Sequence, residues 1–188
     1  IFRMNKPKPP GALEAAASLR NGLDNLIIFN SLSKRSNASG MRAGFIAGDK
    51  NIIESYKLLV SNGASPVPIP IQKVAASLYD DEEHHEKSCI HYDQNFSIVE
   101  KYLKPFYNDF KLPDAGFFLW LKVKDDQQAA KILWNKYSLR VMPGSFMGTN
   151  VDGLNPGKGF LRISVVDDKD VIEETMKRLR LFLQSEIS

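Results

Sequence analysis

Apolar residues recur along the chain at spacings that alternate between those of β-strands and those of α-helices. Apolar runs typical of strands lie at 26–29, 43–48, 117–123, 139–142 and 159–165. Helical spacing, alanine content and capping residues predict helices at 12–19, 49–59, 72–79, 125–137 and after Asp167-Asp168. The first strand is continuously apolar, which indicates burial on both faces. The alternation predicts an α/β fold.

The second half of the chain opens with a longer apolar stripe. Its members recur at steps of three and four residues, as on the buried face of a long helix in which Pro105 can introduce a kink. They are Phe96, Val99, Leu103, Phe106 and Phe110. The last helix shows the same spacing at Ile172, Met176, Leu179 and Leu183. We therefore expect helices packed on one face of a short sheet, as in a small α+β domain.

A charged stretch at 80–87 separates this half from the first, after an irregular, proline-rich segment at 61–70. We expect a domain boundary there, with residues 1–80 in one domain and 81–188 in the small domain. His84 and His85 lie in the charged stretch, but adjacent residues diverge on a helix, and no distant set of Cys or His completes a metal site. The sequence favours an exposed surface without a metal.

Composition narrows the classes of function. The chain has 188 residues, of which 43% are hydrophobic and 25% charged, enough for a sizeable core. Its net charge of +3 comes from interspersed basic and acidic residues, so it does not favour nucleic acid or membrane partners. A single cysteine, Cys89, excludes an internal disulfide and fits a reducing compartment. With no apolar run that could span a bilayer and no secretory pattern, we expect a cytoplasmic protein.

Lys34 lies at the centre of the most informative motif. It ends Ser31-Leu32-Ser33-Lys34, and Ser39-Gly40-Met41-Arg42-Ala43-Gly44 follows. A lysine amine can bond to the aldehyde of pyridoxal phosphate, while serine hydroxyls and an arginine hold its phosphate. Lysines near serines are common in surface loops, but the spacing to Arg42 between two apolar segments favours the cofactor site.

These residues match the signature Ser-x-Ser-Lys-(x)n-Gly-x-Arg-x-Gly, so the chain resembles the fold-type I, class I/II aminotransferases. The resemblance implies that residues 1–80 form the C-terminal part of the large cofactor domain. It also implies that Ser31, Ser33, Lys34 and Arg42 bind pyridoxal phosphate, with Lys34 catalytic. In that family an aspartate, a tyrosine and a stacking aromatic of the site precede this region. The chain therefore resembles the C-terminal half, and it needs the missing N-terminal half to complete the site.

Arg162 is the second residue of chemical interest. Strand alternation places Leu161, Ile163 and Val165 on one face and Arg162 on the other. An exposed strand arginine is ordinary, but the resemblance implies a bidentate pair with the substrate's α-carboxylate. The segment 141–148 is similar to the family's Pro-Gly-x-x-Phe-Gly loop at the mouth of the site, although Phe146 comes one position early.

The resemblance also implies an amino acid and a keto acid as substrates and a homodimer, toward which the segment 61–70 would reach. The run from Ser31 to Arg42 is most similar to the succinyldiaminopimelate aminotransferases, which act on glutamate and N-succinyl-2-amino-6-oxopimelate in lysine biosynthesis. LL-diaminopimelate, aromatic and aspartate aminotransferases and carbon-sulfur lyases of the same branch remain alternatives. A noncatalytic module that retains the fold is a further one.

Overall fold

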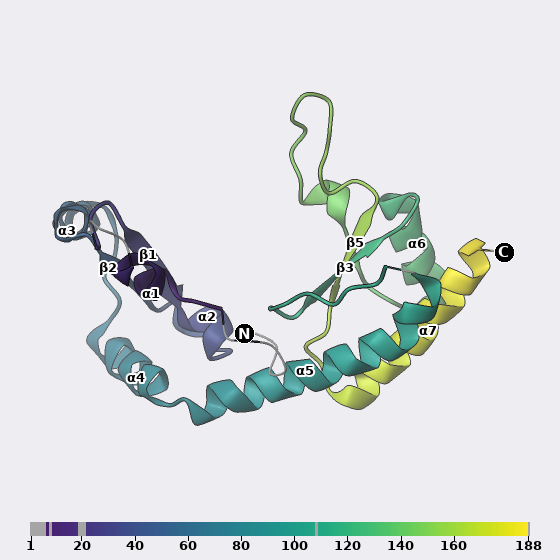
Figure 1. Ribbon diagram of the computed structural model, residues 1–188, viewed down its shortest axis with the longest axis horizontal. Coiled ribbons are helices and arrows are strands. Elements are labelled where there is room, and N and C mark those ends of the chain that lie inside the picture. The colour runs from purple at the N-terminus through teal and green to yellow at the C-terminus, as the bar shows by residue number, and fades with distance from the viewer. Residues whose placement is uncertain (1–6, 8, 19–21, 108, 188) are drawn as a thin grey trace. The chain divides into compact units, whose positions relative to one another are not determined.

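The structure is a computed structural model that describes residues 7, 9–18, 22–107 and 109–187 (Figure 1). The chain divides into two compact units, Ile1–Cys89 and Ile90–Ser188. Helix α5 (Glu83–Leu103) contains the point of division, and the charged stretch forms the end of α4 and the first turn of α5. The assignment of residues 1–80 to a large domain and 81–188 to a small one stays a prediction.

The first unit is built around a two-stranded antiparallel sheet. Strand β1 (Ile27–Ser31) pairs with β2 (Gly44–Gly48), with Ser31 opposite Gly44. Helix α2 (Leu32–Arg35) and the 3₁₀ turn η1 (Ser39–Met41) connect the strands. The other helices of the unit are α1 (Ala12–Ala17), α3 (Lys50–Gly63) and α4 (Ile69–Asp80). The predicted end of α1, at residue 19, lies outside the described residues.

The prediction that the first strand is buried was wrong. The side chain of Phe29 is 65% exposed, and that of Phe45 on β2, which pairs with Asn30, is 46% exposed. Among the described residues this sheet has two strands, so little of its surface is covered. The local core consists of Leu32, Ala43 and Ala75, with smaller contributions from residues around them.

Two segments near α3 differ from the predicted boundaries. Asp49 caps α3 as predicted, accepting from the backbone N–H groups of Asn51 and Ile52 at 2.7 and 3.3 Å. The helix continues to Gly63, and α4 begins at Ile69 with Pro70 in its first turn. Proline is compatible with a first turn because that position needs no N–H. The irregular segment is therefore shorter than 61–70.

The second unit is a three-stranded antiparallel sheet with helices packed against it. The strands are β3 (Phe118–Lys122), β4 (Met142–Pro143) and β5 (Phe160–Ser164), in the order β3-β5-β4. Helices α6 (Asp126–Tyr137) and α7 (Lys169–Ile187) pack with α5 (Figure 1). Strand β4 is shorter than predicted because its end, Pro143, leads into the 3₁₀ turn η3 (Gly144–Phe146).

The predicted core of this unit is confirmed in most positions. Phe96, Val99 and Leu103 of α5 are fully buried, as are the four predicted positions of α7 to within 4% exposure. Pro105 does not kink the helix. It lies in the 3₁₀ turn η2 (Lys104–Phe106) after α5 has ended, because a proline interior to a helix removes a hydrogen bond and clashes with the preceding turn.

The alternation predicted for β5 is confirmed. Leu161 and Ile163 are buried in the core, while Arg162 is half-buried on the opposite face. Along the described ranges, no helix is both long and apolar enough to cross a membrane. Within the same residues, no group of three His, Cys, Asp or Glu side chains is placed to hold a metal ion.

Candidate active site

Ser31 is both the last residue of β1 and the N-cap of α2. Its Oγ caps α2 by accepting from the Ser33 backbone N–H at 3.2 Å, and its hydroxyl donates to Ser33 Oγ at 3.1 Å. The strand pairing places Gly44 directly opposite, where a Cβ would collide with the Asn30 carbonyl oxygen. Glycine at position 44 therefore permits the close strand approach that fixes Ser31.

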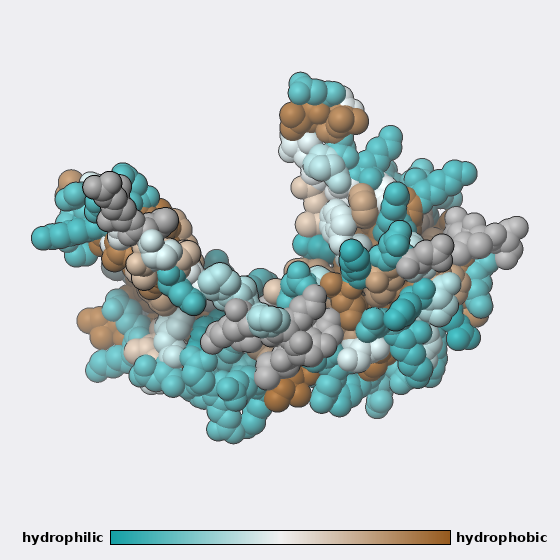
Figure 2. Space-filling view, in the orientation of Figure 1, coloured by the Kyte–Doolittle hydropathy of each residue, from teal (hydrophilic) through white to brown (hydrophobic). Residues whose placement is uncertain are grey.

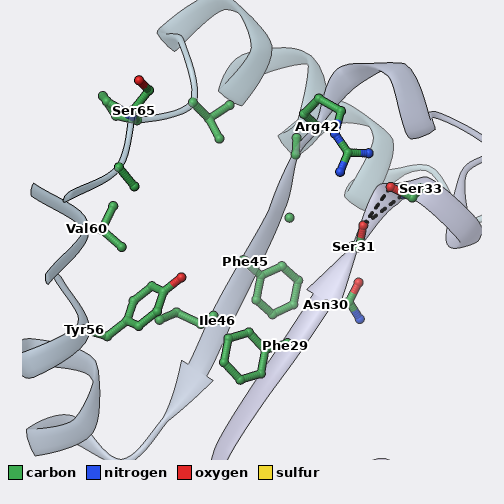
Figure 3. A pocket seen from close by; sticks show the side chains of 15 residues that line it. Phe29, Asn30, Ser31, Ser33, Arg42, Phe45, Ile46, Tyr56, Val60 and Ser65 are labelled. Atoms are coloured by element: carbon green, nitrogen blue, oxygen red, sulfur yellow. Dashed lines mark hydrogen bonds between the residues drawn. The ribbon is translucent and has the colours of Figure 1, made fainter. Parts of the chain in front are cut away.

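Arg42 approaches the same place from the end of η1, two residues before β2 begins. Its backbone is left-handed, with φ of 50°, and its Nη1 donates to the Ser39 carbonyl at 3.0 Å. Ser31, Ser33 and Arg42 line one open hollow of about 730 Å³. Figure 3 shows their side chains toward one end of the hollow and Tyr56, Val60 and Ser65 toward the other. Two hydroxyls and a guanidinium are donors suited to a phosphate dianion.

Lys34 is placed differently from the other three predicted residues. It follows Ser33 in α2 and its side chain is exposed, but it is not one of the residues that line the hollow. Consecutive helical residues point in different directions, so the turn that presents Ser33 turns Lys34 away. The structure thus brings the three predicted phosphate ligands together around one hollow, while Lys34 is not among the residues that line it.

Arg35 has a structural role that the sequence left open. Its guanidinium donates to the carbonyl oxygens of Leu78 and Tyr79 at 2.8 and 3.3 Å and pairs with Glu82 at 2.6 Å. These contacts attach the short motif helix α2 to the end of α4. Because α2 has only four residues, it depends on such tertiary contacts for its position.

Tyr79 is a further residue near the site that the sequence did not indicate. Its hydroxyl donates to Asn30 Oδ1 at 3.1 Å, and its ring meets Phe45 edge-on at 5.0 Å between centroids. Burial raises the pKa of the Tyr79 phenol, against the opposing effect of the Arg35 charge. No local pattern marks such a residue, because Tyr79 and Asn30 lie 49 positions apart.

Arg162 belongs to the second unit and lies on an aromatic surface. Its guanidinium carbon stands 4.5 Å from the centre of the Phe118 ring, a favourable cation-π geometry. Trp120 is its partner on β3 and Met142 its partner on β4. The contact with the Phe118 ring limits the positions open to the guanidinium, whose planar fork of N–H donors is suited to a carboxylate.

The loop after β4 differs from the expected pattern at Phe146, whose side chain is 68% exposed. Contacts are made instead by the glycines on either side. A Cβ at Gly144 would collide with the Gly157 carbonyl oxygen, and a Cβ at Gly148 with the Asn155 side chain. The early position of Phe146 therefore leaves the glycine packing of the loop intact.

Comparison with known proteins assigns this fold and site to a class. Residues 6–179 match the family described as aminotransferase class I and II, and the chain belongs to that family. An LL-diaminopimelate aminotransferase of Desulforudis audaxviator is 30% identical over 177 residues, which are 92% of this chain and 43% of that protein. A (5-formylfuran-3-yl)methyl phosphate transaminase of Methanocaldococcus jannaschii is 25% identical, covering 92% of this chain and 46% of that protein.

The crystal structure of an aminotransferase from Neisseria meningitidis matches 98% of this chain and 47% of its own, with a TM-score of 0.87 and 36% identity. The expected fold class, part of a fold-type I transferase, is thereby confirmed. The chain spans less than half the length of the curated relatives it matches. The family depends on pyridoxal phosphate, and the donors around the hollow fit the phosphate of that cofactor.

Proposed function

We propose that the complete protein is a pyridoxal-phosphate-dependent aminotransferase that exchanges an amino group between glutamate and a keto acid. The observation that carries this proposal is the convergence of Ser31, Ser33 and Arg42 on one hollow, with Lys34 directly after Ser33 in the chain, in a member of this family. When bound there, the cofactor supplies an electron sink for cleavage of a Cα–H bond.

Each residue has a separate task in this proposal. Ser31, Ser33 and Arg42 hold the phosphate, and the guanidinium of Arg42 offsets part of the negative charge of the dianion. Lys34 anchors the cofactor's aldehyde carbon and then, as a free amine, takes the proton from Cα of the amino donor. Arg162 pairs with the donor's α-carboxylate. The residues that complete the site would come from the part of the protein that precedes this chain.

The proposed acceptor is N-succinyl-2-amino-6-oxopimelate, on the strength of the Ser31-to-Arg42 run. A specific observation favours a second candidate, since a relative at 30% identity bears the name LL-diaminopimelate aminotransferase. Both candidate substrates share the seven-carbon pimelate backbone with its two carboxylates, and they differ in whether the distal nitrogen carries a succinyl group, which adds a third carboxylate.

An exchange assay on the complete protein, loaded with pyridoxal phosphate, tests the function. Glutamate formation from 2-oxoglutarate is measured with N-succinyl-LL-diaminopimelate, with free LL-diaminopimelate and with aspartate or phenylalanine as donor. We expect the succinylated donor to be used best and Lys34→Ala to lower its rate by about 10²–10⁴-fold.

The other outcomes of this assay are equally informative. Preference for free LL-diaminopimelate would select the second candidate, and preference for aspartate or phenylalanine would exclude both. Elimination of pyruvate from cystathionine without exchange would indicate a carbon-sulfur lyase. Absence of any turnover, with the cofactor bound, would identify a noncatalytic member of the fold.

A further inference from the structure

Two segments next to Arg162 are packed backbone against backbone. The loop 143–148 follows β4, and the turn 155–159 leads into β5. Side chains are excluded from their contact, because a Cβ at Gly144 would strike the Gly157 carbonyl oxygen and a Cβ at Gly157 would strike that of Gly144. The loop and the turn therefore form one unit, which we call the glycine clamp.

The side chain of Asn155 hydrogen-bonds to both segments of the glycine clamp. Its side-chain amide donates to the carbonyl oxygens of Ser145 and Gly148 at 2.9 and 3.2 Å, and its Oδ1 accepts from the Gly157 N–H at 2.9 Å. All three bonds go to backbone groups. The amide therefore fixes the path of both segments without depending on other side chains.

Asp126 attaches the glycine clamp to the start of α6. It is one of the few buried polar residues, with 3% of its surface exposed. One carboxylate oxygen accepts from the Ser145 N–H at 2.8 Å and the other from the Gly159 N–H at 3.1 Å. Burial acts to raise the pKa of this carboxyl, but the bonds from Ser145 and Gly159 outweigh it and hold the pKa below its usual value.

The two backbone groups that bond to Asp126 lie in the two segments that lead to Arg162 and to its β4 partner. Gly159 immediately precedes β5, and its carbonyl accepts from the Val123 N–H at 2.8 Å, which sets the start of the pairing with β3. Ser145 lies in the loop that follows β4, whose Met142 is paired with Arg162. Gly159 lies three residues before Arg162, so a shift there would be passed along the backbone. Ser145 lies three residues after Met142, so a shift there would be passed through Met142 and its pairing with Arg162.

We propose that Asp126, together with Asn155, is a positioning residue that fixes the glycine clamp and through it the place of the Arg162 guanidinium. The proposal rests on the proposed function, in which Arg162 binds the substrate α-carboxylate. A role in stability alone is the competing explanation. The two differ in whether the effect of Asp126 depends on Arg162.

The experiment is a double-mutant cycle in the complete, cofactor-loaded protein. Arg162→Lys keeps the charge but loses the planar fork, so kcat/KM for glutamate should fall about a hundredfold or more. In Asp126→Asn, the side-chain NH₂ group must face the backbone N–H of Ser145 or Gly159, so one hydrogen bond is lost. We therefore expect kcat/KM to fall about tenfold, mainly through a higher KM. The double variant should be no worse than Arg162→Lys alone, because the positioned group is already altered.

Two readouts separate positioning from general damage. The affinity for 2-oxoglutarate, measured by calorimetry, should weaken in both single variants, whereas the affinity for pyridoxal phosphate should stay unchanged. Asp125→Asn is the matched control, since it removes the same charge at the same helix end. The Asp125 carboxylate accepts only from Gln128 within α6, so its loss should leave 2-oxoglutarate binding unchanged.

Asn155→Asp serves if Asp126→Asn does not fold. It places a carboxylate oxygen against two carbonyl oxygens and should weaken 2-oxoglutarate binding in the same way. Additive losses in the cycle, or equal losses from Asp125→Asn, would overturn the inference. If Arg162→Lys itself leaves kcat/KM near normal, the proposed role of Arg162 fails instead.

Discussion

Ser31, Ser33 and Arg42 are the residues for which local sequence was most informative. Their spacing was enough to predict that they share a site, since a strand, a tight turn and a returning strand must bring them together. Arg35, Tyr79 and Asp126 were not predicted. Arg35 acts through partners 43 to 47 positions away, and Asp126 through partners 19 and 33 positions away. Contacts between residues so far apart in the chain leave no periodic pattern in the sequence.

For a single residue, we predict that Lys34 is the lysine that bonds covalently to the cofactor. Treating the complete, cofactor-loaded protein with borohydride should fix a pyridoxyl group on Lys34, because it alone follows the serine pair that we propose as phosphate ligands. Peptide mapping identifies the labelled lysine, and Lys50→Arg, at the start of α3, is a control that should keep the label. A label on any other lysine would remove the basis of the site assignment.

Helices and strands were predicted in the right order, and the errors lie at their ends and in their burial. The cap at Asp49 was found because a capping carboxylate is a local signal. The exposure of β1 was not predicted from the sequence, because the burial of a strand depends on which other elements cover it and not on its own residues. The prediction for Pro105 was limited in the same way. A proline indicates that a helix is interrupted, but the sequence alone does not decide whether the helix bends or ends there.

Asp49 allows a prediction for the elements it joins. Its carboxylate accepts from Asn25, Asn51 and Ile52, which ties the turn before β1 to the start of α3, and these bonds lower its pKa from 3.8. Asp49→Ala should lower the thermal midpoint by roughly 2–5 °C near neutral pH. Asp24→Ala, in the preceding turn, should not.

The pH dependence of this effect has a definite sign. A carboxyl whose pKa is lowered by folding stabilises the protein fully above its unfolded value of 3.8, and the contribution is lost as the pH falls through the lower folded value. The difference in midpoint between Asp49→Ala and the parent should therefore shrink below that pH. A constant difference would mean that packing, not the charge, is responsible.

At the scale of the whole molecule, we expect the complete protein to be a homodimer, as the family resemblance implies. Sedimentation velocity at assay concentration, with activity measured on the same sample, is the direct measurement. An active monomer would contradict the expectation. The segment 61–70 is the part that we expect to reach toward the other subunit, and deletion of 64–68, its stretch between α3 and α4, should shift the equilibrium toward monomer.

The two-stranded sheet makes the two units unequal in their capacity to fold independently. In the described part of the chain, β1 and β2 are each hydrogen-bonded along one edge, with Phe29 and Phe45 open to water. An isolated hairpin is marginally stable, and its unpaired edges are templates for other extended segments. The second unit encloses its own core, and Val151 and Leu154 are among its exposed apolar residues. Figure 2 shows apolar surface near the tip of its long loop. Because the buried core cluster in the described part of the first unit is limited to Leu32, Ala43 and Ala75, we expect it to be the less stable of the two units when each is studied alone.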